Sequence, residues 1–173
     1  MRIRTSDMQS SLPHVRRAVY PGTFDPPTNG HFDVAKRATL IFDEVIIGVT
    51  ENPSKKEFFS LNERIDMLHV LFDQEKKIKI KSFKGLLVDF VVKEKAIAIV
   101  RGLRAVSDFE YELQLASLNL MLNKAAETVF FMSSEENLFV SSSMVKEIAR
   151  LGGDISQKVH PYVLEKLKIK FRH

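Results

Sequence analysis

Five short apolar runs, separated by stretches with helical periodicity, limit the folds open to this chain. Runs such as Val45–Val49 and Ala96–Val100 are apolar throughout, which is typical of strands buried on both faces of a parallel sheet. Ile78–Lys81 alternates apolar and polar residues and predicts a strand with a more exposed face. The other two runs are Ala18–Tyr20 and Thr128–Met132. Five strands that alternate with helices predict an α/β fold, an open five-stranded parallel sheet with helices on both faces.

Several helix starts can be predicted from capping residues. Ser60 and Glu63 have the spacing of a capping box and begin a predicted helix. Asp108 can cap a long helix that reaches about Asn123. Ser143 or a neighbouring serine is expected to cap a further helix near the end of the chain.

The chain has 173 residues, enough for one domain with a full hydrophobic core. Residues 1–14 are mostly polar and show no periodicity, so we predict a flexible N-terminal extension before a single domain over residues 15–173. The sequence has no cysteine, which excludes disulfides and cysteine-bound zinc and fits a cytoplasmic protein. No apolar run approaches the roughly 20 residues that span a bilayer, so no membrane partner is expected.

The formal net charge of +4 is unevenly distributed. Residues 1–17 carry +3 and residues 158–173 carry +4, whereas the segment between them carries −3. Proteins that bind nucleic acid usually have a basic patch or stripe. No basic stripe with interleaved aromatic residues runs through the central segment, so we expect no nucleic-acid partner.

The stretch AVYPGTFDPPTNGH, Ala18–His31, carries the strongest functional signal. It predicts a strand, a tight turn and a helix start, and Gly22 would let the backbone approach a ligand closely. The N–H groups of a first helical turn have no internal partners and lie at the positive end of the helix dipole, so they attract phosphate. His31 falls within that turn, where a ring N–H could reach the same phosphate.

The loops that follow the five predicted strands should meet at one edge of the sheet. The carboxyl ends of parallel strands share an edge, and ligands of Rossmann-like sheets bind beyond it. These loops are Pro21–His31, Thr50–Lys56, Lys84–Leu87, Arg101–Glu112 and Ser133–Ser143.

Three motifs, in the same order along the chain, resemble those of a known family. Gly22–Pro26 followed by Thr28–His31 is similar to the signature of the nucleotidyltransferase superfamily with an HxGH-type motif. Arg101–Glu112 and Ser141–Lys146 match as well, and together the motifs most closely resemble the bacterial phosphopantetheine adenylyltransferase family. The resemblance covers nearly all of the chain from about Arg17 onward.

The resemblance implies an enzyme of coenzyme A biosynthesis. Such an enzyme transfers the adenylyl group of ATP to the phosphate of 4'-phosphopantetheine by direct in-line displacement, giving dephospho-coenzyme A and pyrophosphate. The acceptor is already an anion, so the reaction needs donors and cations rather than a general base. His31 is the expected catalytic residue, which donates a hydrogen bond to the α-phosphate and the leaving group. Another small nucleotidyltransferase of the same fold, or a non-catalytic nucleotide-binding protein, is the alternative.

The same resemblance implies ligand-binding roles for residues of the loops. The expected acceptor-binding residues are Thr23, Lys55, Leu87 and Arg101. The expected ATP-binding residues are Thr23, Phe24, His31, Gly102, Leu103, Arg104, Glu112, Asn137, Leu138, Phe139, Val140, Ser141, Ser142 and Ser143.

Each assignment competes with a structural alternative. Leu87 can be an ordinary core leucine, Lys55 a solvated loop residue and the triple serine a helix cap. Two positions also depart from the family pattern. Pro27 stands where the family more often has a branched apolar residue, and Asn137 where an aromatic residue is often found.

Two partners follow from these patterns. ATP chemistry implies Mg²⁺, which neutralises the triphosphate, but the sequence shows no cluster of carboxylates and we assign no protein ligand for the metal. The predicted helix after Asp108 is apolar on two sides, and such a helix must be covered twice. We expect the sheet on one side and a second subunit on the other, hence a homo-oligomer, which the resemblance implies to be a hexamer.

Overall fold

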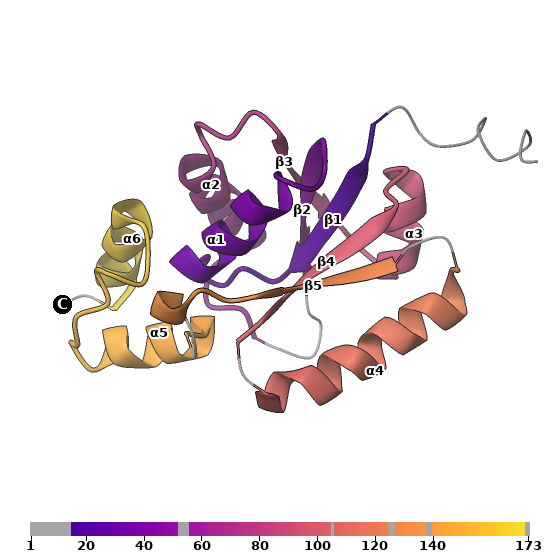
Figure 1. Cartoon of the computed structure of the whole chain (residues 1–173). Helices are drawn as coiled ribbons and strands as arrows, with labels where there is room; N and C mark the ends of the chain where they lie inside the picture. The colour runs from indigo at the N-terminus through magenta and orange to yellow at the C-terminus, as the bar shows by residue number, and fades with distance from the viewer. Residues whose placement is uncertain (1–14, 52–55, 105, 125–126, 138–139, 172–173) are drawn as a thin grey trace, which may run out of the picture.

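The computed structural model describes residues 15–51, 56–104, 106–124, 127–137 and 140–171. Five parallel strands form one sheet in the order β3-β2-β1-β4-β5, which confirms the predicted fold (Figure 1). The strands are β1 (Arg17–Gly22), β2 (Glu44–Thr50), β3 (Ile78–Phe83), β4 (Ala98–Leu103) and β5 (Glu127–Met132). The helices are α1 (Asn29–Ala38), α2 (Leu61–Leu71), α3 (Leu87–Lys93), α4 (Val106–Leu122), α5 (Ser142–Arg150) and α6 (Pro161–Phe171), with a 3₁₀ turn, η2, at Glu135–Asn137.

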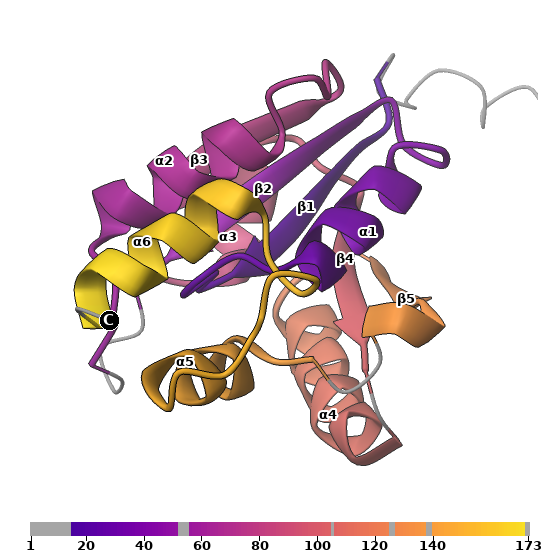
Figure 2. The same cartoon turned by 90° about the vertical axis from the view of Figure 1, so that its left-hand side faces the viewer.

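Helices cover both faces of the sheet. Contacts place α1 and α2 on one face and α3 and α4 on the other (Figures 1 and 2). Successive residues of β1 alternate between these layers: Ala18 and Tyr20 belong to the core that includes Val34 of α1, whereas Val19 packs with Phe90 of α3. The central strand is therefore buried on both faces, as its continuous apolar run predicts.

The α5 and α6 helices lie at the edge formed by the carboxyl ends of the strands (Figure 2). Ser142 Oγ of α5 donates a hydrogen bond to the Pro26 carbonyl, just beyond β1, at 2.8 Å. The first residue of α1, Asn29, donates its backbone N–H to the Lys158 carbonyl at 2.9 Å. These contacts hold the C-terminal part of the chain against the turn between β1 and α1.

The capping predictions succeeded in two of three cases. Ser60 and Glu63 form the predicted capping box, in which the Ser60 N–H donates to Glu63 Oε2 at 2.7 Å. Ser141 is the serine that caps α5, and its Oγ accepts from the Met144 N–H at 3.1 Å. The prediction that Asp108 caps α4 was wrong, since α4 already begins at Val106. An N-cap precedes the first helical turn, whereas Asp108 lies inside it.

Many apolar side chains of α4 remain exposed in the single chain. Phe109 packs against Phe130 of β5, with 6.2 Å between ring centroids, yet it is 42% exposed. Leu118, Met121 and Leu122 are 51%, 70% and 55% exposed. Such a concentration of exposed apolar side chains is unusual for a surface helix of a monomeric protein. Among the described residues, neither α4 nor another helix has the length and apolar character needed to cross a membrane.

Candidate active site

The His31 side chain closes the N-terminal cap of α1. Thr28 is the N-cap residue, and its backbone N–H donates to His31 Nδ1 at 2.9 Å. The His31 N–H in turn donates to Thr28 Oγ1 at 3.4 Å. A ring nitrogen that accepts from a backbone N–H carries no proton, so the neutral imidazole has its proton on Nε2. The cap therefore sets the tautomer in which Nε2–H is the donor.

His31 is held in its neutral form. Burial, together with the positive charges of Arg104 and Arg101, lowers the pKa of His31 to about 4. The ring therefore carries one proton throughout the neutral pH range. It can donate a hydrogen bond to a phosphate oxygen without first taking up a proton.

The turn between β1 and α1 depends on a close approach at Gly22. A Cβ at this position would lie 2.9 Å from atoms of the Phe24 ring, so a side chain would displace that ring. Phe24 adopts a φ of 51°, which residues with a side chain rarely do. Its ring packs edge-on against Tyr20 and His31, with centroid distances of 5.5 and 5.0 Å. The turn thereby supports the imidazole from one side.

Arg101, in β4, forms a bidentate ion pair with Glu112 of α4. Arg101 Nε donates to Glu112 Oε2 at 2.6 Å, and Nη2 donates to Oε1 at 2.5 Å. Arg101 Nη1 also donates to the Pro21 carbonyl at 3.2 Å, which ties β4 to the end of β1. The two residues that the resemblance assigned to different substrates are thus bound to each other in this structure.

These groups share one cavity of about 150 Å³. It brings together residues of two motifs that are far apart in the sequence, Gly22–His31 and Arg101–Glu112, and Val140, which directly precedes the third motif. Tyr20, Val34 and Ser133, which sequence reasoning had not assigned to a site, also line it. The predicted site residues in its wall are Phe24, His31, Arg101, Gly102, Arg104, Glu112 and Val140. The cavity therefore combines a neutral donor, two guanidinium groups and one carboxylate.

Comparisons with known proteins identify the family. The family model of cytidylyltransferase-like proteins matches residues 19–148. A phosphopantetheine adenylyltransferase of Thiobacillus denitrificans is 48% identical over 155 residues, which cover 90% of this chain and 97% of that protein. The chain belongs to the phosphopantetheine adenylyltransferase family. This confirms the family inferred from the three motifs and makes the protein a nucleotidyltransferase.

Solved adenylyltransferase structures share the fold. The nicotinic acid mononucleotide adenylyltransferase of Plasmodium falciparum, complexed with NaAD, superposes with a TM-score of 0.68 at 16% identity, covering 92% of this chain and 97% of that one. A bifunctional NMN adenylyltransferase/ADP ribose pyrophosphatase of Francisella tularensis, complexed with AMP and a Mn ion, has a TM-score of 0.67 at 16% identity. The match covers 91% of this chain and 51% of that protein.

Other residues expected to bind ligands in this adenylyltransferase family member lie outside the lining of the described cavity. Leu87 packs against the core around Val19 and Phe90, as the structural alternative predicts. Leu103 is buried, with 7% of its surface exposed. Lys55, Leu138, Phe139 and the side chain of Asn137 lie outside the described residues.

Thr23 and the serines make structural contacts. The Thr23 carbonyl accepts a hydrogen bond from Arg64 at 2.7 Å. Ser141 caps α5 through the Met144 N–H, and Ser142 donates to the Pro26 carbonyl, which joins α5 to the turn after β1. Ser143 lines a separate surface hollow.

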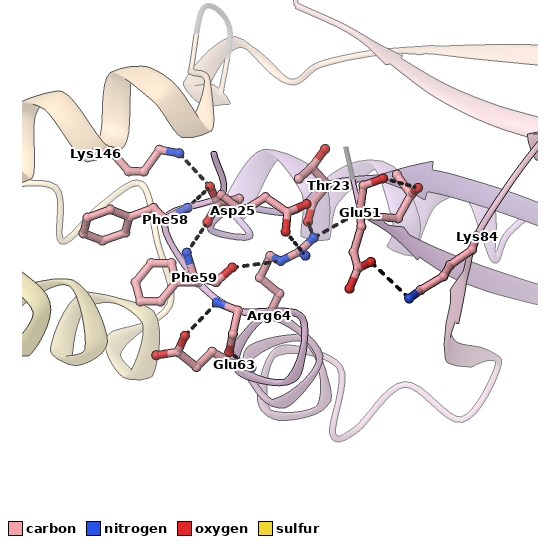
Figure 3. A network of polar contacts seen from close by, with 12 residues as sticks. Thr23, Asp25, Glu51, Phe58, Phe59, Glu63, Arg64, Lys84 and Lys146 are labelled. Atoms are coloured by element: carbon pink, nitrogen blue, oxygen red, sulfur yellow. Dashed lines mark hydrogen bonds and ion pairs between the residues drawn. The ribbon is translucent and has the colours of Figure 1, made fainter. Parts of the chain in front are cut away.

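Beside the turn, Arg64 of α2 joins the ends of two strands (Figure 3). Its side chain is fully buried, and Nη1 donates to the carbonyls of Thr23 and Thr50 at 2.7 and 2.9 Å. Nε donates to the Phe59 carbonyl at 3.2 Å, and Nη2 pairs with Glu57 at 2.7 Å. Arg64 therefore links the residue after β1 to the last residue of β2. From the sequence alone, an arginine inside an amphipathic helix is expected on the protein surface, so the buried position of Arg64 was not predicted.

Asp25 fixes the same turn from the other side (Figure 3). Its carboxylate accepts the backbone N–H groups of Phe58 and Phe59 at 2.9 and 2.8 Å and pairs with Lys146 of α5 at 2.8 Å. A carboxylate so occupied, and only 7% exposed, is an anchor rather than a metal ligand. The described residues contain no group of three or more His, Cys, Asp or Glu side chains suited to a metal ion.

Proposed function

We propose that this protein transfers the adenylyl group of ATP to the phosphate of 4'-phosphopantetheine, giving dephospho-coenzyme A and pyrophosphate. The observation that carries the proposal is the shared cavity of His31, Arg101 and Arg104 in a chain of the phosphopantetheine adenylyltransferase family. Donors and cations around one cavity meet the demand of a reaction between two anions.

The proposed reaction is a single in-line displacement. An oxygen of the acceptor phosphate forms a bond to the α-phosphorus of ATP, while the bond to the bridging oxygen breaks and pyrophosphate leaves with the electron pair. The acceptor oxygen is already anionic, so no side chain has to remove a proton. What the protein supplies is orientation and stabilisation of the charge that develops on the phosphorus-bound oxygens.

His31 is the catalytic residue in this proposal. Its Nε2–H donates to an α-phosphate oxygen and to the leaving pyrophosphate as negative charge grows there. The cap at Thr28 supports this role, because it holds Nδ1 as an acceptor and so keeps the proton on Nε2. Removal of one such preorganised donor typically costs about 10²–10³ in kcat.

The remaining roles are divided between the two substrates. Arg101 binds the acceptor phosphate, together with Thr23, Lys55 and Leu87. Arg104 binds the triphosphate. The other proposed ATP-binding residues are Thr23, Phe24, Gly102, Leu103, Glu112, Asn137, Leu138, Phe139, Val140, Ser141, Ser142 and Ser143. Support for this division comes from the cavity wall, where Arg101, Gly102 and Arg104 follow one another at the end of β4.

Magnesium enters with ATP in this proposal. When bound, Mg²⁺ neutralises part of the triphosphate charge. Glu112 is the one carboxylate in the described lining of the cavity, and Arg101 occupies both of its oxygens. This donor set fits a metal held mainly by the phosphates of ATP and by water.

We also propose that the protein is a cytoplasmic homo-oligomer, a hexamer as in the family it resembles, without nucleic-acid or membrane partners. The exposed apolar side chains of α4 support a subunit contact there. The sequence without cysteine fits the reducing cytoplasm.

The test is an acceptor-specific assay of pyrophosphate release. The protein is incubated with ATP, Mg²⁺ and either 4'-phosphopantetheine, nicotinamide mononucleotide or glycerol phosphate. Release with 4'-phosphopantetheine alone, at 1:1 stoichiometry with dephospho-coenzyme A, supports the proposal. Release with another acceptor assigns a different substrate to the same site, and tight ATP binding without release indicates a nucleotide-binding protein.

A further inference from the structure

The hydroxyl of Tyr20 is a polar group of the cavity to which the proposed function gives no role. Tyr20 lies in β1, is only 6% exposed and lines the cavity with His31, Arg101 and Arg104. A buried tyrosine hydroxyl normally has a hydrogen-bond partner. Within the part of the chain that the structure describes, no hydrogen-bond partner of this hydroxyl is found.

The hydroxyl must therefore open into the cavity. No fully buried side-chain nitrogen or oxygen of the described residues lacks a partner, so an unpaired oxygen has to reach the cavity surface. A Cβ built on Gly102 would lie 3.6 Å from the Tyr20 oxygen, which places the hydroxyl beside the backbone of Gly102. The ring packs edge-on against Phe24 at 5.5 Å, so the position of the hydroxyl is set before a ligand binds.

The surroundings determine what this hydroxyl can bind. Burial raises the pKa of Tyr20 well above its usual value, so the phenol keeps its proton and is available as a donor. Arg101 and Arg104 line the same cavity and favour a negatively charged ligand. A fixed O–H donor beside two guanidinium groups is suited to an anionic oxygen such as that of a phosphate.

We propose that the Tyr20 hydroxyl donates a hydrogen bond to a substrate phosphate oxygen held in the cavity beside Arg101 and Gly102. This inference rests on the proposed function, which supplies the phosphates. The oxygen belongs either to the triphosphate of ATP or to the phosphate of the acceptor, and the two sources share the same recognition chemistry. Tyr20 is then a phosphate-binding residue.

The first test is Tyr20→Phe, which keeps the ring and its packing on Phe24. We expect kcat/KM to fall about tenfold or more, as for a lost hydrogen bond to a charged group, with an unchanged melting temperature. A rise in the KM for ATP assigns the bond to the triphosphate, and a rise in the KM for 4'-phosphopantetheine assigns it to the acceptor. Tyr162→Phe, in α6, is the matched control and should leave both constants unchanged. Unchanged constants in Tyr20→Phe would overturn the proposal.

A second measurement does not require Tyr20 to be replaced. The chain has three tyrosines, so the variant with Tyr111→Phe and Tyr162→Phe keeps Tyr20 alone, and 3-fluorotyrosine then reports on it by fluorine NMR. We expect the resonance to shift on saturation with ATP or with 4'-phosphopantetheine. A resonance that neither bound ligand moves contradicts the inference. If ATP moves it but no pyrophosphate is released with any acceptor, the proposed function fails and the Tyr20 contact stands.

Discussion

Arg101 and Glu112 form a bidentate ion pair through two hydrogen bonds in the wall of the cavity. The proposed reaction requires each of these side chains to bind a ligand there. A phosphate presents the same planar pair of acceptors to a guanidinium as a carboxylate does. An incoming phosphate can therefore replace Glu112 on Arg101 without loss of bonds. Until then Glu112 keeps the guanidinium extended toward the cavity and neutralises its charge.

Glu112→Gln should separate the two consequences of this pairing. The variant keeps the side-chain shape but leaves the charge of Arg101 uncompensated, so we expect the free energy of unfolding to fall by about 1–2 kcal/mol, less than for a fully buried pair. 4'-Phosphopantetheine should bind more tightly, on the order of tenfold, because its phosphate no longer competes with a carboxylate for Arg101. Denaturant unfolding and titration calorimetry measure the two effects.

A matched control for that variant is Glu44→Gln. Glu44 pairs with Arg17 Nε at 2.8 Å at the opposite end of the sheet, with comparable exposure. We expect a small loss of stability and an unchanged affinity for 4'-phosphopantetheine. Equal affinity for 4'-phosphopantetheine in all three proteins would show that Glu112 does not compete for Arg101.

His31→Gln is the sharper test of the catalytic histidine. Glutamine is a natural residue at the third position of a capping box, so it can still accept the Thr28 N–H while the Nε2–H donor is lost. We expect kcat to fall about 10²–10³-fold, with little change in the affinity for ATP. His31→Ala should lower kcat similarly and also weaken the cap of α1. Steady-state kinetics with both substrates decides, and an unaltered kcat removes His31 from its role.

The fold could be predicted because its signals are local. Continuous apolar runs predicted the buried strands, and the alternation at Ile78–Lys81 predicted the exposed face of β3, which lies at an edge of the sheet. The start of α4 could not be predicted in this way. The helix begins two residues before Asp108. The preference of aspartate for the N-cap position is only a weak local signal for where a helix begins.

Residues of the candidate site could be predicted only where they belong to a sequence motif. The signature around His31 and the stretch from Arg101 contain donors and cations that line one cavity in the structure. Tyr20 had been assigned only to a buried strand, because nothing in an apolar run shows where a hydroxyl points. Arg64 lies in a helix with polar neighbours, and two of its backbone carbonyl partners, Thr23 and Thr50, precede it by 41 and 14 residues. Contacts of this kind exist only after the chain has folded.

The depressed pKa of His31 predicts a pH dependence of stability. The ring titrates near 6.5 when unfolded and at about 4 when folded, so between these pH values the unfolded state binds more protons. The contribution of His31 to the free energy of unfolding is fully present above pH 6.5 and is lost as the pH falls toward 4. It amounts to at most about 3 kcal/mol. The difference in unfolding free energy between the native protein and His31→Gln should therefore change across pH 4–6.5 and be constant above it. A constant difference throughout contradicts the prediction.

Arg64→Met should be strongly destabilising. It removes the partner of a carboxylate and of three backbone carbonyls, so we expect the free energy of unfolding to fall by about 3–5 kcal/mol. Arg16→Met is the matched control, since Arg16 pairs with Asp43 on the surface with 60% and 42% of the two side chains exposed. That change should cost far less, because an exposed ion pair contributes little to stability. Similar losses of unfolding free energy for both variants in urea would show that Arg64 does not stabilise the contact between the two strand ends.

The exposed apolar side chains of α4 predict a multimer in solution. Leu118→Glu places a charge among Tyr111, Leu122 and their neighbours, and burying that charge against a second subunit would be costly. Light scattering at micromolar concentration should therefore show a multimer for the native chain and a smaller species for the variant. Leu40→Glu is the control: Leu40 follows α1 and is 82% exposed, so the same charge there should leave the mass unchanged. A native chain that is monomeric would mean that α4 is not a subunit interface, and its apolar surface would then need another explanation.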